Sequence, residues 1–188
     1  MSQTTVLPNG MAVALPGQLA DTGPHDVVTG FSGETVLQIP WGYGLRKAFS
    51  GDPQMHILPT GASGTFEIVG INAFRNNAMK GGAQLADGSF PGEVGASGLL
   101  PKAMLDVLRA GRAYVPVEVD VRDGDRAFCR AGAQGASGGA GIWLGTGVSG
   151  TVDCRRQAVF RSNTILSADG TTRVALLEFD FTNFPGAV

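Results

Sequence analysis

The chain has 188 residues and a formal net charge of −2, and only 16% of its residues are charged, below the roughly 25% that is usual for soluble domains. Without a basic surplus, binding to nucleic acid through its phosphates is disfavoured. No apolar run approaches the roughly 18 residues that a membrane helix needs, so we expect neither nucleic acid nor membrane as a partner.

Glycine and proline determine the expected fold class. The 29 glycines and 10 prolines interrupt helices repeatedly, whereas clusters of Val, Ile, Phe and Thr favour strands. The length suits one domain with its own core. We predict a mainly β protein, with a compact antiparallel β-barrel or sandwich-like domain over residues 25–188. An extended N-terminal arm (1–24) and long Gly-rich loops (76–98 and 131–141) complete the predicted organisation.

The first 24 residues combine prolines and glycines with small apolar residues and show no strong periodicity. Such a segment cannot build a core alone, but it can lie extended along a neighbour. Two interpretations stay open: a frayed terminus, or an ordered arm that contacts a partner. There is no charged segment followed by an apolar one, so no secretory signal is expected. The candidate contact residues of the arm are Val6, Leu7, Met11, Val13, Leu15 and Leu19.

Period-two alternation and turn signals place the expected strands. The clearest is Ala113–Val121, in which every second residue is apolar, followed by a turn at Asp123-Gly124 and a returning strand at Arg126–Cys129. Residues 102–108 are compatible with a short helix, but we favour a strand that a turn at 109–111 separates from Ala113. Further strands are expected at 26–31, 35–39, 45–49, 55–58, 65–74 (with a bulge at Gly70), 142–144, 151–162 and 173–181, with a hairpin signal at Asp169-Gly170.

Two aromatic residues, Trp41 and Tyr43, are spaced by glycines where the strand pattern breaks after Pro40. Tryptophan and tyrosine are enriched at protein interfaces, which makes this pair a candidate contact surface. A place in the core is the more common outcome for such residues, and we favour it while both interpretations stay open.

The ligand-type side chains are few and scattered. Cys129 and Cys154 are far apart in the chain, and without an export signal free thiols are favoured over a disulfide. They cannot complete a zinc site, because His25 and His56 lie far upstream without ligand spacing. Both histidines are expected at the surface. No metal or other cofactor is predicted.

Three patterns suggest chemistry, and each has a simpler explanation. Residues 145–150 fit G-x-G-x-x-G, but a strand-like sequence follows where a dinucleotide site needs a helix. Residues 135–139 fit G-x-S-x-G, but no histidine lies downstream to act as base. Glu118 and Asp120 share one strand face and offer a carboxylate pair, which a solvated face explains better. No enzyme activity is predicted.

Four passages, in the order in which they occur, resemble the small β-rich cement (decoration) proteins of tailed bacteriophage heads. They are PGQLADTGPHDVVTGFSGE, IPWGYGLRKA, MLDVLRAGRAYVPVEVDVRDGDRAFCR and QAVFRSNTILSADGTTRVALLEFDF. Together they cover most of the chain. The family has no catalytic residues to transfer, which agrees with the motif search.

The resemblance implies a virion structural protein, made in the host cytoplasm, that binds the outside of the mature capsid. There it would bridge neighbouring capsomers and resist the internal DNA pressure. The implied partners are the major capsid protein and other copies of the chain, as a dimer or trimer. The arm residues, Trp41 and Tyr43 are then candidate capsid or subunit contacts.

Two other functions remain open. The first is a carbohydrate- or surface-binding β module of a phage fibre or adhesin, for which exposed aromatic residues are expected. The second is a small hydrolase, which is disfavoured because no nucleophile and base are assembled.

Overall fold

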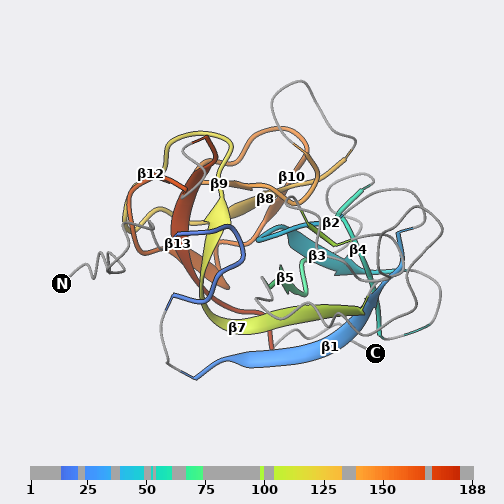
Figure 1. Ribbon diagram of the computed structural model, residues 1–188. Coiled ribbons are helices and arrows are strands. Elements are labelled where there is room, and N and C mark those ends of the chain that lie inside the picture. Colours follow the sequence, from blue (N-terminus) through green and yellow to red (C-terminus); the bar gives the residue numbers. More distant parts are fainter. Residues whose placement is uncertain are drawn as a thin grey trace.

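The computed structural model describes residues 14–20, 24–34, 39–48, 52, 54–60, 67–73, 98–99, 104–132, 139–167 and 171–182. All regular secondary structure within these residues is β, which confirms the predicted class (Figure 1). The strands are β1 (Asp26–Ser32), β2 (Ile39–Pro40), β3 (Gly44–Lys47), β4 (Met55–Ile57), β5 (Gly70–Asn72), β6 (Gly98–Leu99), β7 (Met104–Pro116), β8 (Phe128–Arg130), β9 (Trp143–Leu144), β10 (Thr151–Asp153), β11 (Ala158–Phe160), β12 (Ile165–Leu166) and β13 (Arg173–Asp180).

Five of the strands close into a small barrel in the order β1-β4-β3-β5-β7, with β7 pairing back to β1. The pair β1–β4 is parallel and the other four pairs are antiparallel, so the predicted barrel is mixed rather than purely antiparallel. Strand β13 extends the sheet from β7, and β11 and β12 pair along β13. Strands β10, β8 and β9 form a second sheet, and β2 pairs with β6.

Strand β7 joins the barrel to the rest of the domain. Residues 104–110 pair with β1 and residues 110–116 pair with β13, on opposite edges of the strand. The predicted turn at 109–111 was therefore wrong, because the two ladders hold these residues in one continuous strand. The local irregularity survives as a bulge: Asp26 lies opposite Ala110 while Val27 lies opposite Leu108. Arg109 is thus the extra residue on β7.

The bulge lets one strand serve two hydrophobic cores. Leu105 and Val107 lie in a smaller core with Ile39, Trp41, Leu45, Leu58 and Ala140. Leu108, Ala113 and Val115 lie in the larger core. Leu108 and Ala113 are separated by an odd number of positions, so they would face opposite sides of a regular strand. The extra residue between them puts both side chains into the same core.

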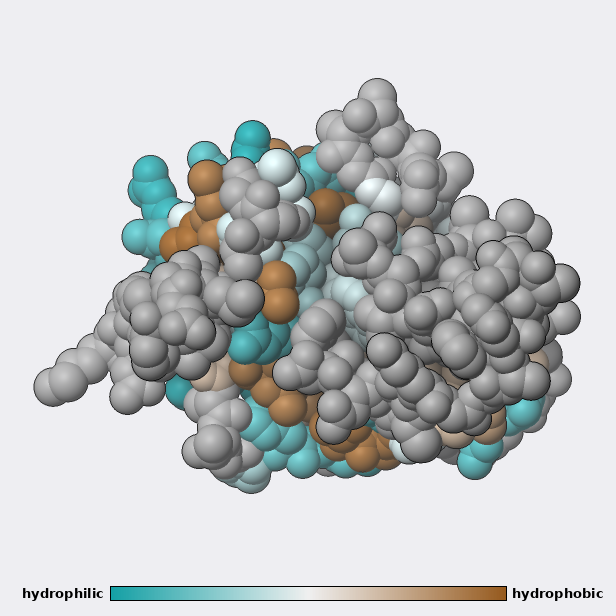
Figure 2. All heavy atoms as spheres, in the orientation of Figure 1, coloured by the Kyte–Doolittle hydropathy of each residue, from teal (hydrophilic) through white to brown (hydrophobic). Residues whose placement is uncertain are grey.

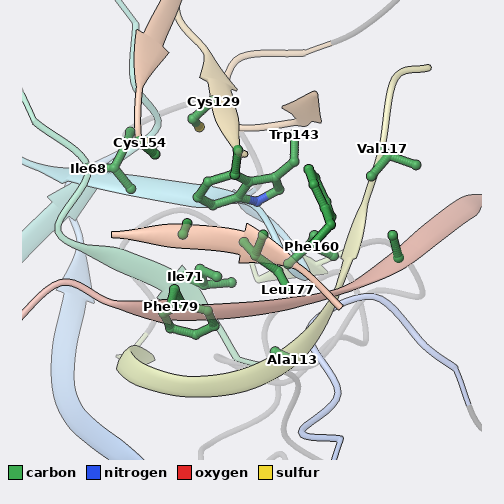
Figure 3. Close-up of a cluster of buried hydrophobic side chains, with 14 of the residues drawn as sticks. Ile68, Ile71, Ala113, Val117, Cys129, Trp143, Cys154, Phe160, Leu177 and Phe179 are labelled. Atoms are coloured by element: carbon green, nitrogen blue, oxygen red, sulfur yellow. The ribbon is translucent and has the colours of Figure 1, made fainter. Parts of the chain in front are cut away.

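The larger core gathers side chains from both sheets (Figure 3). Trp143 and Phe160 are fully buried, and Phe181 stacks on Trp143 and Phe179 with ring centroids 6.3 and 5.4 Å apart. The predicted alternation of the last strand is confirmed, since Ala175, Leu177, Phe179 and Phe181 are at most 4% exposed. In the Ala113–Val121 segment every second residue is buried except Val119.

Cys129 and Cys154 also lie in the larger core as free thiols, as the sequence favoured. Cys129 on β8 pairs with Val152 on β10, and Cys154 lies two residues after Val152. Burial raises the pKa of both thiols, which keeps them protonated and unreactive at neutral pH.

Several predicted details need correction. The turn around Asp123-Gly124 forms, but the strand after it pairs with β9 and β10 instead of returning along β7. The predicted strand 151–162 is divided into β10 and β11 by a turn that begins at Cys154. Gly70 is not a bulge. A Cβ there would lie 2.4 Å from Val107 Cγ1, so the glycine permits β5 and β7 to approach closely.

Some predictions fall outside the described residues. They include positions 35–38 of one predicted strand, the Asp169-Gly170 turn, most of the 76–98 loop and residues 133–138 of the second Gly-rich loop. The expected strands at 26–31, 45–49 and 55–58 are present as β1, β3 and β4 with slightly different bounds.

His56 is buried, with 5% of its surface exposed, so the expectation of a surface histidine was wrong. Its Nδ1 lies 2.9 Å from the backbone oxygen of Gln54. A Cβ on Gly30 would lie 2.6 Å from the same nitrogen, so the ring occupies the space that this glycine leaves open. Burial is the main cause of the lowered pKa of His56.

The close approach at Gly70 predicts a strong effect of one methyl group. We expect Gly70→Ala to destabilise the protein by about 2 kcal/mol, because the new Cβ meets the Val107 side chain and, at 2.9 Å, the Leu108 backbone oxygen. Urea unfolding measures the loss. Gly124→Asn is the matched control: no atom lies within 4 Å of a Cβ there, and Asn tolerates a positive φ. Equal losses in both variants would contradict the steric account.

The lowered pKa of His56 predicts a pH dependence of stability. The unfolded state, with a histidine pKa of about 6.5, binds the proton before the folded state does as the pH falls. Stability is therefore lost from about pH 6.5 downward until the folded-state pKa is passed. We expect the wild type to lose stability to urea between pH 7.5 and 5.5, and His56→Gln to lose clearly less. The half-buried His25 provides the control, His25→Gln. An unchanged slope in His56→Gln would overturn the assignment.

Candidate interaction surface

The described part of the predicted arm begins with a tight turn. Residues Leu15-Pro16-Gly17-Gln18 place proline second and glycine third, with a φ of 77° at Gly17. This is the residue pattern of a type II turn. The Gln18 backbone N–H donates to the Leu15 oxygen at 3.0 Å, and the Gln18 side chain accepts the Leu15 N–H at 3.1 Å. The turn is therefore specified by its own four residues.

After the turn, the segment lies along β7 as an additional short strand. Gly17 donates to the Tyr114 oxygen at 2.7 Å, Tyr114 donates to the Gln18 oxygen at 2.9 Å, and Ala20 donates to the Arg112 oxygen at 3.1 Å. Strand β13 occupies one edge of β7 at these positions, so the segment lies on the edge that β1 occupies further along. Of the predicted contact residues here, Leu15 is half-buried and Leu19 is 38% exposed.

The aromatic turn at Trp41-Gly42-Tyr43 packs directly against this segment. Gly42 has a φ of 76°, and a Cβ there would lie 2.7 Å from the Gly17 nitrogen and 2.7 Å from Pro116 Cδ. The Gly42 oxygen accepts the indole N–H of Trp143 at 3.0 Å, and the Gly42 N–H donates to the Asn72 backbone oxygen at 2.8 Å. The structure thus brings together two groups of predicted site residues that are separate in the sequence.

The two aromatic side chains have different environments. Trp41 is 4% exposed and belongs to the smaller core, as the favoured interpretation expected. Tyr43 packs against that core but remains half-buried, and burial raises its pKa. In this region, the predicted contact residues that retain exposed surface are therefore Tyr43, Leu15 and Leu19. Val6, Leu7, Met11 and Val13 lie outside the described residues.

An exposed apolar strip on β1 and β7 was not predicted. Val27, Phe31 and Met104 are 43, 41 and 44% exposed, and Phe31 lies directly opposite Met104 across the ladder. Figure 2 shows hydrophobic side chains along the lower part of this face, over β1 and β7. The alternation of β1 marked these positions as one face, but nothing in the sequence showed which face is exposed.

A second exposed apolar group lies on β12, where Ile165 and Leu166 are 43 and 60% exposed. Figure 2 shows it at the upper left. The Thr164 N–H donates to the Val121 oxygen at 3.1 Å, which holds β12 beside the segment that carries Val119, itself 44% exposed. A strand of two residues leaves no periodic signal, so the sequence did not reveal this group. Exposed apolar patches of this kind mark protein contacts.

The carboxylate pair considered from the sequence does not exist as a site. Glu118 is half-buried, with 7% of its side chain exposed, and forms a two-pronged ion pair with Arg130, in which Arg130 Nη2 lies 2.7 Å from Glu118 Oε1 and Nε bonds Oε2. Asp120 is 80% exposed and lies 3.8 Å from Arg173. The expectation of a solvated face holds for Asp120 and was wrong for Glu118. The two carboxylates therefore have no shared environment.

The other motifs add no chemistry. Residues 145–150 form the connection from β9 to β10, so no helix begins where a dinucleotide site would need one. Positions 135–138 of the G-x-S-x-G string lie outside the described residues. Within the described ranges, no three His, Cys, Asp or Glu side chains are arranged to hold a metal ion. The same part of the chain contains no helix able to span a membrane.

The chain is similar to a known protein family and to chains of solved structures. The family described as structural cement protein (E217 gp24/Pam3 gp6) matches residues 2–177 of the chain. A chain of the solved structure titled "The capsid of Myoviridae Phage XM1" is similar in fold, with a TM-score of 0.58 and 19% sequence identity over 88% of this chain and 89% of that one. The search of curated proteins found no match.

The partly buried ion pair between Glu118 and Arg130 predicts a clear asymmetry between the Glu118 and Asp120 carboxylates. We expect Glu118→Ala to destabilise the protein by about 3 kcal/mol, because it leaves the Arg130 charge without its partner. Asp120→Ala, at an exposed position, should cost less than about 0.5 kcal/mol. Urea unfolding of both variants tests this. Replacing the pair together, with Glu118→Leu and Arg130→Met, should recover most of the loss. Similar losses in the two single variants would contradict the account.

Proposed function

The chain belongs to the phage structural cement protein family, and we propose that it binds the outer surface of the mature capsid and holds neighbouring capsomers together against the pressure of packaged DNA. As a member of this family it is a structural component of the virion capsid and contacts capsid protein. The family is non-enzymatic, which confirms the expectation drawn from the failed motif search. The family match over residues 2–177 carries the proposal.

The proposed partners are the major capsid protein and further copies of the chain, as a dimer or trimer. Each contact can be weak, because an oligomer that holds several capsid subunits gains affinity through effective concentration. If only the expanded shell presents the correct spacing, binding stabilises that shell by mass action. Because bound copies stabilise the expanded shell, they also oppose the internal pressure of the packaged DNA. The protein itself is made in the host cytoplasm.

We place the contacts at the N-terminal arm and the neighbouring aromatic turn. The arm carries Val6, Leu7, Met11 and Val13, and its described end, which includes Leu15 and Leu19, meets the aromatic turn where Gly17 approaches Gly42. Trp41 supports this surface from within the core rather than contacting a partner. The division into an arm (1–24) and a domain (25–188) stays a prediction, with residues 17–20 attached to β7.

The carbohydrate-binding alternative has no specific support. For that function, exposed aromatic residues are expected, and the candidates are Trp41, Tyr43 and Trp143. Trp41 is 4% exposed, Trp143 is fully buried with its indole N–H bonded to Gly42, and Tyr43 is half-buried. Two of the three rings therefore offer no stacking face for a sugar.

Cosedimentation with phage shells tests the proposed function. The purified protein is mixed in parallel with expanded and unexpanded shells of the source phage. We expect saturable binding to expanded shells alone, at a stoichiometry that reports the symmetry site. Absence of binding to expanded shells would overturn the proposal.

Two deletions distinguish a role of the arm in binding from its role in stability. Removing residues 1–13 should abolish or strongly weaken shell binding or oligomerisation while urea unfolding stays unchanged. Removing residues 1–20 also deletes the hydrogen bonds to Tyr114 and Arg112 and should lower stability as well. Unchanged shell binding and oligomerisation after removal of residues 1–13 would exclude those residues from the contact.

A further inference from the structure

A hollow of about 820 Å³ lies next to the turn between β10 and β11. Ile68, Cys154 and Phe181 in its lining are at most 4% exposed and form an apolar floor. Arg126, Arg155 and Arg156 are exposed and form the rim. An apolar floor under a rim of guanidinium groups is suited to a polypeptide segment with both acidic and apolar side chains.

The backbone holds this hollow in place. The turn is closed by Gln157, which donates to the Cys154 oxygen at 3.0 Å, and by Ala158, which donates to the same oxygen at 2.9 Å. The Cys154 N–H donates in turn to the Ala127 oxygen at 3.2 Å. Arg155 and Arg156 therefore project from a turn that is fixed to the segment that follows Arg126.

The three arginines differ in whether their charge is already neutralised. Arg155 Nη2 lies 2.6 Å from Asp153 Oδ2, and its guanidinium also lies over the Phe128 ring at 5.5 Å. Among the described residues, the Arg126 side chain donates only to the Arg155 backbone oxygen, at 3.5 Å. Arg156 has no hydrogen-bond or ion-pair partner among the described residues. Within the described part of the chain, neither Arg126 nor Arg156 thus forms an ion pair with a carboxylate, although the Arg156 charge contributes to lowering the pKa of Asp153.

The local charge contrasts with that of the whole chain. The lining has three arginines against the two carboxylates of Asp153 and Glu67, a surplus of one positive charge. The chain as a whole has a net charge of −2. Arginine forks match carboxylates with two parallel hydrogen bonds, and a partly enclosed site strengthens such a pair relative to open water.

We infer that this hollow receives an acidic segment of the major capsid protein, with Arg126 and Arg156 pairing to its carboxylates and an apolar side chain contacting the floor. The inference rests on the proposed function, because it takes the capsid protein as the partner. Charged contacts of this kind determine which partner segment binds and in which orientation, while the apolar patches supply non-directional attraction.

The test compares the double variant Arg126→Ala/Arg156→Ala with wild type in cosedimentation with expanded shells. We expect about tenfold weaker binding and a much smaller loss of affinity between 50 and 300 mM salt than wild type shows. Urea unfolding and oligomeric state should not change. Arg122→Ala removes an exposed arginine outside the lining and should bind like wild type.

A charge-preserving variant identifies the occupant. Arg126→Lys/Arg156→Lys keeps the charge and supplies amines that a carbodiimide joins to nearby carboxylates. We expect cross-links from these lysines to Asp or Glu of the capsid protein, identified by mass spectrometry. Cross-links only to other copies of this chain would overturn the assigned partner. Binding of short duplex DNA by wild type but not by the alanine double variant would show a phosphate site and overturn it as well.

The outcomes separate this inference from the proposed function. If wild type does not bind expanded shells, the proposed function fails first. If wild type binds and the alanine double variant binds equally well with the same salt dependence, only the acidic-segment inference fails.

Discussion

The bulge at Arg109 is the constraint on which both cores depend. It shifts the alternation of β7, so that Val107 belongs to the smaller core while Leu108 and Ala113 share the larger one. The bulged residue is also well bonded. Its guanidinium Nε donates to Asp26 at 2.8 Å, and its backbone oxygen accepts the Phe181 N–H at 2.8 Å. The irregularity is thus held from both edges of the strand, and the barrel cannot shift register without disturbing the larger core.

The packing also depends on glycine where two backbone segments approach closely. At Gly42 the N-terminal segment, the end of β7 and the aromatic turn meet at distances that leave no room for a Cβ. The indole of Trp143 and the backbone of Asn72 satisfy both polar groups of this one residue. The candidate contact surface is therefore built on the same framework as the core, which gives a partner a rigid surface to bind.

The sequence predicted the features that depend on local pattern. Alternation identified the buried faces of the segments that begin at Ala113 and Arg173. Four short passages, in the order in which they occur, indicated the cement family. It failed where distant segments decide the outcome. Arg109-Ala110-Gly111 resembles a turn in isolation, but ladders from β1 and β13 hold it extended. The contact of Gly17 with Gly42 leaves no periodic trace. The site was predicted as two separate groups, and only the fold places them side by side.

The distribution of surface chemistry is consistent with conditional binding. Among the described residues, the exposed apolar side chains lie on the β1–β7 strip, on β12 and at separate positions such as Leu19 and Val148. One large patch of them would promote association of free copies. Each small group can supply modest attraction, and the arginine-lined hollow is the proposed place of a directional charged contact. Under the proposed function, affinity becomes high only where capsid subunits present several matching sites at the correct spacing. Under the proposed function, this arrangement would let the protein distinguish an assembled shell from free capsid protein through the spacing of its contacts.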